Sequence, residues 1–220
     1  MFRVREWTAS PPWRAWLSDL LRLTIAEPRT SPEAATAPKR IPSKRSRQNV
    51  SVLVGDESVS VRVATPADLD GVLAVQRRSP GRSFSGEFRD DAARAIKDPS
   101  RLFVVAVGAG GMVGWAATKH FAEADGQAPS GHYLMGITVA PESRRRGVAR
   151  RLIEARLDWI RERAGYAYYF TNVRNIASIA LHESLGFREI ARARQFRDVP
   201  FDGGTGILFS LDLNRRTTTA

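Results

Sequence analysis

The residues with the clearest chemical potential lie in one basic turn, residues 139–153, which reads VAPESRRRGVARRLI. An extended run ends at Pro141, and a glycine-containing turn then leads directly into a helical pattern. The first amides of a helix lack internal partners and its macrodipole is positive there, so a helix start binds phosphate. Arginines are unfavourable at that end unless an anion compensates their charge. The turn therefore predicts capture of a pyrophosphate.

Other phosphate-binding patterns are absent or fail in their spacing. The sequence has no Gly-x-x-x-x-Gly-Lys-Ser/Thr loop, which excludes the common nucleoside-triphosphate loop. A second glycine cluster, at residues 108–114, misses the dinucleotide spacing because Val113 stands where the third glycine belongs. This cluster separates two strand-like runs, at residues 102–107 and 112–119, so it predicts a hairpin turn in which glycine accepts positive φ.

Two blocks of the chain resemble the GNAT superfamily of acyl-CoA N-acetyltransferases. The segment RRRGVA at residues 144–149 matches the Arg/Gln-x-x-Gly-x-Gly/Ala signature. The segment NIASIALHESLGF at residues 175–187 matches the family's Asn-x-x-Ala-x-x-Leu-Tyr-Glu-x-x-Gly-Phe pattern. Two positions depart from that pattern, because Ser178 replaces an alanine and His182 replaces the tyrosine. With the strands before these blocks, the resemblance covers residues 58–213.

The resemblance implies acetyl-CoA as the donor substrate. Backbone amides of the turn would hold the pyrophosphate, with Gly147 and Ala149 kept small so that it can approach. Amides near Val139 would pair with the pantetheine arm as a strand would. Asn175 would contact that arm or order the loop, while Ser178 either assists the cofactor or fills a place that needs a small residue. The predicted cofactor-binding residues are Ile137, Thr138, Val139, Arg144, Arg145, Arg146, Gly147, Val148, Ala149, Arg150, Asn175 and Ser178.

The resemblance also implies that the strand before the turn splays from the next strand and leaves a cleft for the thioester. A backbone amide near Val139 would then stabilise the tetrahedral oxyanion. His182 stands where the family has its tyrosine acid, so it either protonates the leaving thiolate or only packs on the sheet. The strand before the turn carries no glutamate base. The expected base is a water held by Thr138 or Tyr133, or a carboxylate elsewhere.

The resemblance places the acceptor between the loop that joins the first two helices, the strand before the turn, and the loop before the last strand. Carboxylates and aromatic rings there suit a cationic small molecule, and ordinary surface polarity explains them equally well. The expected acceptor is a small-molecule primary amine, with aminoglycoside-type antibiotics as one candidate class. The alternatives are acetylation of a protein N-terminus or lysine, and an acyl-CoA-binding module with little catalysis. The candidate substrate-binding residues are Phe84, Glu87, Tyr133 and Asp202.

Composition excludes several other chemistries. The absence of cysteine excludes disulfides and thiolate catalysis, and the three histidines lack metal-ligand spacing, so no metal site is expected. No run of 18 apolar residues and no signal peptide is evident, which predicts a cytoplasmic protein without a membrane span. The net charge is +11, but residues 1–50 carry more than half of it. No nucleic-acid binding is therefore expected of the folded domain, and a homodimer remains an open option.

Composition and periodicity divide the chain into four segments. They are an N-terminal extension with a short amphipathic helix at 1–27, a basic Pro/Ser-rich linker predicted to be disordered at 28–57, the acetyltransferase domain at 58–213 and a C-terminal tail at 214–220.

Within the domain, hydrophobic spacing predicts four helices and seven strands. Their order is the one expected of the GNAT fold, an α/β (α+β) architecture with a mixed, mostly antiparallel central sheet flanked by helices. The predicted helices are 66–76, 87–97, 147–164 and 176–185, and the predicted strands are 60–64, 102–108, 112–121, 132–139, 166–171, 187–194 and 206–212.

Overall fold

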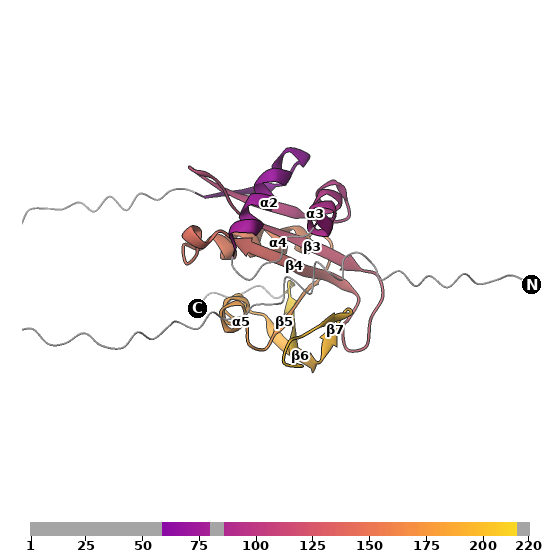
Figure 1. Cartoon of the computed structure of the whole chain (residues 1–220). Coiled ribbons are helices and arrows are strands. Elements are labelled where there is room, and N and C mark those ends of the chain that lie inside the picture. Colours follow the sequence, from indigo (N-terminus) through magenta and orange to yellow (C-terminus); the bar gives the residue numbers. More distant parts are fainter. Residues whose placement is uncertain (1–58, 80–85, 215–220) are drawn as a thin grey trace, which may run out of the picture.

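The computed structural model of the chain describes residues 59–79 and 86–214. The predicted extension, linker and all but the first residue of the predicted tail lie outside these ranges. The described residues form a seven-stranded sheet with the order β1-β2-β3-β4-β5-β9-β6, and a separate hairpin, β7-β8. Neighbouring strands are antiparallel except β4 and β5, which are parallel. The predicted fold class, a mixed and mostly antiparallel sheet flanked by helices, is therefore confirmed (Figure 1).

The elements follow the predicted order, with one additional hairpin. The strands are β1 (Ser60–Val63), β2 (Phe103–Gly108), β3 (Gly111–Phe121), β4 (Gly131–Val139), β5 (Tyr166–Asn172), β6 (Arg188–Ala193), β7 (Gln195–Phe196), β8 (Val199–Pro200) and β9 (Gly206–Asp212). The helices are α2 (Leu69–Arg78), α3 (Gly86–Lys97), α4 (Val148–Arg161) and α5 (Ile176–Glu183), with short 3₁₀ turns at Pro66–Asp68 and Pro141–Ser143.

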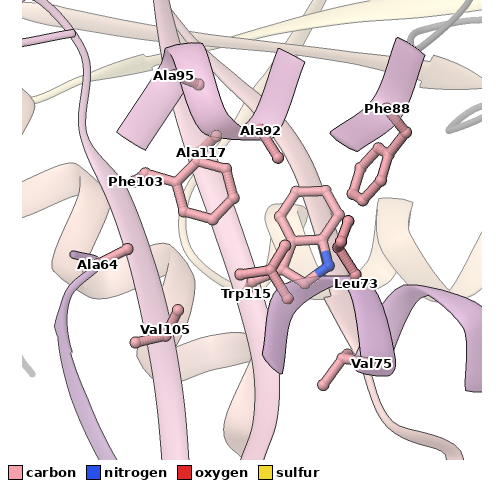
Figure 2. Packing of buried hydrophobic residues seen from close by; sticks show 11 residues of the cluster. Ala64, Leu73, Val75, Phe88, Ala92, Ala95, Phe103, Val105, Trp115 and Ala117 are labelled. Carbon is pink, nitrogen blue, oxygen red and sulfur yellow. The ribbon is translucent and has the colours of Figure 1, made fainter. Parts of the chain in front are cut away.

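Helices α2 and α3 cover one face of the N-terminal half of the sheet. Trp115 of β3 is fully buried at the centre of this layer, with its ring 5.5 Å from Phe88 of α3 and 5.4 Å from Phe103 of β2. Figure 2 shows these rings packed between the helices and the strands, with Ala92 and Ala95 of α3 beside them. Burying a large apolar side chain contributes about 1.5–3 kcal/mol, so this layer holds α2 and α3 firmly against the sheet.

Helices α4 and α5 cover the opposite face. The buried stripe of α4 packs on β3, β4 and β5, and α5 packs beside it against β5 and β9. Figure 1 shows α5 next to β5 on the side of the molecule away from α2 and α3. The two helices that carry the family-like motifs, α4 and α5, therefore share one face of the sheet. The residues of this stripe are Val148, Leu152, Ile153, Leu157 and Ile160.

The β7-β8 hairpin covers the aromatic surface of the sheet that no helix of the described residues covers. Arg197 and Asp198 form its turn with φ of 52° and 62°, a conformation that non-glycine residues rarely adopt. The Arg197 guanidinium is buried and donates to the carbonyls of Glu123 at 2.6 Å, Ala128 at 3.0 Å and Pro129. These bonds tie the hairpin to the loop between β3 and β4. The short hairpin carries none of the Asn-Gly or Asp-Gly signals that predict such turns from sequence.

Candidate functional site

The site forms where two neighbouring parallel strands separate. β4 and β5 are paired only at His132–Ala167 and Tyr133–Tyr168. Beyond these pairs β4 continues along β3 as far as Val139, while β5 continues along β9 to its end. The two strands therefore diverge toward their carboxyl ends and leave a gap between them. This is the splay that the resemblance implied.

A β-bulge in β4 accompanies the separation. Opposite the consecutive residues Ala116 and Ala117 of β3 stand Ile137 and Met135, so Gly136 is the extra residue. Gly136 has φ of 58°, in the left-handed region that favours glycine. A bulge bends its strand and interrupts the ladder. Gly136 therefore marks the place where β4 turns away from β5.

The basic turn after β4 presents unpaired amides at the start of α4. Gly147 is the N-cap of α4 with φ of 78°, and Arg145 before it has φ of 63°. The first bond of the helix is donated by the Arg151 amide to the Gly147 carbonyl at 3.1 Å. The amides that precede Arg151 in α4 therefore remain available to an external acceptor. A Cβ on Gly147 would meet nothing within 4 Å, so its glycine is required by the backbone conformation rather than by crowding.

The arginines of the turn fall into two groups. Arg145 and Arg146 are exposed beside the free amides. Arg144 turns back on β4, where its Nε donates to the Val139 carbonyl at 3.2 Å. Arg150 leans on α5 and donates to the Ser184 hydroxyl at 2.8 Å, while the Arg151 guanidinium donates to the Val59 carbonyl at 2.7 Å. Free amides beside exposed guanidinium groups suit a diphosphate.

Val139 directs its backbone toward the gap. The next amide along the chain, that of Ala140, donates to the Val113 carbonyl beside β3 at 2.8 Å. Successive residues of a strand point their peptide groups to opposite sides, so the amide and carbonyl of Val139 face away from β3. The bond from Arg144 to the Val139 carbonyl agrees with this direction. The strand therefore offers polar backbone groups on the side where β5 has moved away.

The wall of the gap opposite β4 is built from β5 and the start of α5. Asn175 caps α5: its side-chain oxygen accepts from the Ser178 amide at 3.4 Å, and its amide donates to Thr171 Oγ1 at 3.0 Å. Ser178 Oγ lies 2.6 Å from the hydroxyl of Tyr169, which is buried on β5. Two predicted residues, Asn175 and Ser178, are thus brought together on one polar wall and fix α5 against β5.

His182 is buried behind this wall. Its ring is 1% exposed and stacks on Tyr169 with centroids 3.6 Å apart and an interplanar angle of 2°. Its Nδ1 lies 2.8 Å from the Ser178 carbonyl, which can only accept, so Nδ1 carries the proton and donates. Desolvation by burial is the main cause that lowers the pKa of His182 to about 3. The ring is therefore neutral at neutral pH and its Nε2 presents a lone pair. A general acid at this position would first have to gain a proton, so the acid role expected of His182 stays a prediction.

Tyr133 does not reach the gap with its hydroxyl. The side chain is fully buried in an aromatic cluster with Phe121 and Phe170, and its hydroxyl donates to the Pro129 carbonyl at 2.6 Å. It lies at the closed end of the gap, where β4 still pairs with β5. The Tyr133 hydroxyl is therefore engaged away from the gap, and the roles expected of Tyr133 in catalysis and acceptor binding stay predictions.

The Thr138 side chain extends from β4 toward α2. Its buried hydroxyl donates to Oε1 of Gln76 at 3.2 Å. This pair joins β4 to α2 on the face of the sheet opposite α4. The Thr138 hydroxyl keeps lone pairs that can accept a hydrogen bond, so its expected role in holding a water stays a prediction.

The candidate acceptor residues are dispersed. Phe84 lies outside the described residues. Glu87 stands in the first turn of α3, and Asp202 lies in the loop before β9; both are exposed. The Asp202 carbonyl accepts from the Asn172 side chain at 2.7 Å, which ties this loop to the end of β5. No hydrogen bond or ion pair joins Glu87 to Asp202 within the described part of the chain, and both stay predictions for an acceptor site.

Sequence reasoning missed three buried polar residues near the gap: Gln76, Tyr169 and Arg156. Arg156 is 1% exposed and lies on the apolar stripe of α4, four residues after Leu152 and four before Ile160. A charged residue at a core position of an amphipathic helix is a signal that sequence alone contains. The contacts of Tyr169 and Gln76 depend on long-range packing, which spacing along the chain does not reveal.

Within residues 59–79 and 86–214 no group of three His, Asp or Glu side chains is arranged to hold a metal ion. None of the helices there has the length and apolar character needed to cross a membrane.

Comparisons of the sequence identify similar proteins. The profile of the Acetyltransferase (GNAT) family matches residues 70–187. N-alpha-acetyltransferase RimI of Mycobacterium tuberculosis is 31% identical over 104 residues, which cover 47% of this chain and 62% of that protein. The ribosomal protein bS18-alanine N-acetyltransferase of Escherichia coli K12 is 42% identical over 65 residues, which cover 29% of this chain and 43% of that protein. Each match spans less than two thirds of the relative's length.

Solved structures of acetyltransferases are similar to the fold of this chain. The ribosomal-protein-S18-alanine N-acetyltransferase of Escherichia coli superposes with a TM-score of 0.57 at 22% identity, covering 74% of this chain and 98% of that chain. Salmonella typhimurium yncA, solved with its cofactor acetyl-CoA, superposes with a TM-score of 0.57 at 20% identity, covering 74% of this chain and 98% of that chain. The ribosomal-protein-alanine N-acetyltransferase of Brucella melitensis superposes with a TM-score of 0.57 at 25% identity, covering 70% of this chain and 99% of that chain. The first two similarities show the fold alone.

The burial of His182 predicts a pH dependence of stability. The pKa of His182 is about 3 in the folded protein, and its ordinary value of 6.5 applies to the unfolded chain. Between pH 3 and pH 6.5 the unfolded chain therefore binds a proton at His182 that the folded chain does not. Protonation of His182 in the unfolded chain therefore leaves the free energy of unfolding almost unchanged above pH 6.5 and lowers it progressively as the pH falls below 6.5. Between pH 7 and pH 5 the free energy of unfolding should fall by about 2 kcal/mol more in the wild type than in His182→Phe. Urea unfolding at both pH values measures this. Equal pH dependence in the two proteins would contradict the assigned protonation state.

Proposed function

The chain belongs to the acetyltransferase (GNAT) family, whose profile matches more than half of it, and on this premise we propose that it transfers the acetyl group of acetyl-CoA to the N-terminal amine of a protein. The observation that carries the donor assignment is the turn at Gly147, where unpaired α4 amides and exposed arginines lie beside the gap between β4 and β5. A helix start of this kind binds a pyrophosphate without further devices.

The separated strands suit the rest of the donor. The backbone of Val139 faces the gap, so a pantetheine arm can bond to β4 as an added strand would. The gap closes where Tyr133 pairs with Tyr168, which limits how far the arm extends. Coenzyme A supplies a thioester whose carbonyl an amine can attack. With the pyrophosphate at Gly147 and the arm along β4, the thioester lies between the bulge and the polar wall of α5.

The residues of the chain bring the amine and the thioester together, and proximity then supplies much of the acceleration. The Val139 amide, directed into the gap, is placed to donate to the oxyanion of the tetrahedral intermediate. The attacking nitrogen must lose a proton. We assign its removal to a water that the Thr138 hydroxyl accepts from, since that hydroxyl keeps free lone pairs while it donates to Gln76.

The comparisons favour a protein acceptor over the small-molecule amine expected as the main possibility. Two relatives are named for N-terminal or alanine N-acetylation, and one of them for a ribosomal protein. None of the similar proteins described above is named for an aminoglycoside substrate. The same reaction on a small amine needs no different donor site. The choice of acceptor therefore depends on the segments outside the donor site, among which the start of α3 with Glu87 and the loop with Asp202 are the candidates.

Gly147→Val should weaken acetyl-CoA binding at least about tenfold, because a β-branched residue at positive φ displaces the amides of the turn. Gly126→Val is the matched control: Gly126 also has positive φ with open space around its Cβ position, but it lies in the loop between β3 and β4. Isothermal titration with acetyl-CoA measures both. Equal affinity in Gly147→Val and wild type, with both proteins folded, would contradict the assignment of this turn to the pyrophosphate.

Release of coenzyme A thiol in the presence of different amines tests the acceptor. We expect turnover with a peptide that begins with a free alanine, and none with the same peptide after chemical acetylation of its N-terminus. An aminoglycoside and a peptide whose only amine is an internal lysine serve as comparators. Faster turnover of either comparator than of the free alanine peptide would contradict the N-terminal assignment, and absence of turnover with all of them would favour a binding module.

A further inference from the structure

Helix α4 buries one charged side chain, that of Arg156, in its apolar stripe. The residue is 1% exposed, and no ion pair among the described residues involves it. Burial of a charge without an opposite charge costs several kcal/mol of stability. Burial lowers the pKa of Arg156 to about 9, so the guanidinium stays charged at neutral pH. A leucine at this position would satisfy the helix pattern at no such cost.

The hydrogen bonds of Arg156 converge on the bulge. Its Nε donates to the Leu152 carbonyl of its own helix at 3.1 Å. Its Nη1 donates to the Ala117 carbonyl of β3 at 3.0 Å and to the Gly136 carbonyl of β4 at 3.3 Å. These carbonyls lie where the register between β3 and β4 shifts and the ladder is interrupted. The guanidinium thus supplies hydrogen-bond donors to the carbonyls at the bulge from the α4 side of the sheet. These bonds hold β4 where it turns away from β5.

The remaining nitrogen, Nη2, is buried and has no hydrogen-bond partner. The titratable groups that Arg156 influences are the Tyr169 hydroxyl of β5 and the His182 ring of α5, both neutral at neutral pH. These two rings stack behind the polar wall of the gap. The positive charge therefore lies on the α4 side of the bulge, close enough to Tyr169 and His182 to influence their ionisation, and nothing on the described elements neutralises it.

We propose that Arg156 is a positioning residue that fixes the β4 bulge and whose uncompensated charge stabilises the thiolate of coenzyme A. The inference rests on the proposed function. The amine nitrogen attacks the acetyl carbon, the carbon–sulfur bond breaks with its electron pair on sulfur, and the amine proton passes to water. A negative sulfur then forms in the gap beside the bulge at Gly136, the residue whose carbonyl accepts from Arg156. A buried cation acts strongly there because little water screens it.

The test is the ionisation of coenzyme A bound to the full-length protein. The thiolate absorbs in the ultraviolet, so a pH titration of the binary complex yields the pKa of the bound thiol without any turnover. We expect the wild type to raise the acid dissociation constant of the bound thiol about tenfold or more over that of free coenzyme A. Arg156→Gln keeps a donor for the bulge carbonyls but loses the charge, so it should abolish most of this increase. Arg156→Lys keeps the charge and should retain it.

The outcomes separate the possible failures. If the wild type binds coenzyme A and leaves its thiol unchanged, the proposal is overturned, whether or not a variant folds. If Arg156→Gln ionises the thiol as strongly as the wild type, the charge is not the cause and the proposal is again overturned. Failure of the wild type to bind coenzyme A at all would instead refute the proposed function from which the inference starts.

Discussion

The separation of β4 from β5 is the constraint on which the rest of the site depends. Two parallel strands in one sheet normally continue their ladder, yet these two share only the pairs at His132 and Tyr133. The carboxyl half of β4 therefore has β3 on one side and an open side toward β5. The polar backbone of that half must find other partners, because unpaired buried peptide groups are unfavourable. The gap is thus both an incomplete sheet and a site for a ligand that resembles a strand.

Three neighbouring features make this incomplete sheet stable enough to persist. Gly136 accepts the positive φ of the bulge, and Arg156 donates to the carbonyl that the bulge displaces. Asn175 caps α5 and bonds to Thr171, which fixes the opposite wall. The antiparallel partners of the two strands, β3 and β9, complete the support. Polar groups are therefore concentrated on both sides of the gap, although the surrounding layers are apolar.

Much of this arrangement could be predicted from the sequence because local signals specify it. The glycine-containing turn before an amphipathic helix predicts both the start of α4 and its phosphate chemistry, and alternation predicts the strands of the main sheet. The protonation of His182 could not be predicted, since it follows from burial against Tyr169 and from a backbone acceptor one turn earlier. The direction of the Tyr133 hydroxyl depends on Pro129, which is close in sequence but positioned by the β7-β8 hairpin.

That hairpin illustrates a second limit. Its turn residues, Arg197 and Asp198, adopt a conformation that usually requires glycine or asparagine. Bonds from Arg197 to carbonyls of a loop about seventy residues earlier in the chain hold it in place. Long-range contacts therefore override local preference, and local preference is all that a single sequence displays. Arg156 is the opposite case, because its place on an apolar stripe was visible from spacing while its partners were not.

Amide hydrogen exchange with and without saturating coenzyme A probes the open side of β4 and the start of α4, because it reports on the backbone groups themselves. We predict slower exchange on binding at Val139 and at residues 147–150, the amides that face the gap and precede the first bond of α4. Amides of the β2-β3 turn at residues 109–111 should exchange at the same rate in both states. Protection elsewhere in the domain, with exchange at residues 147–150 unchanged, would contradict the account.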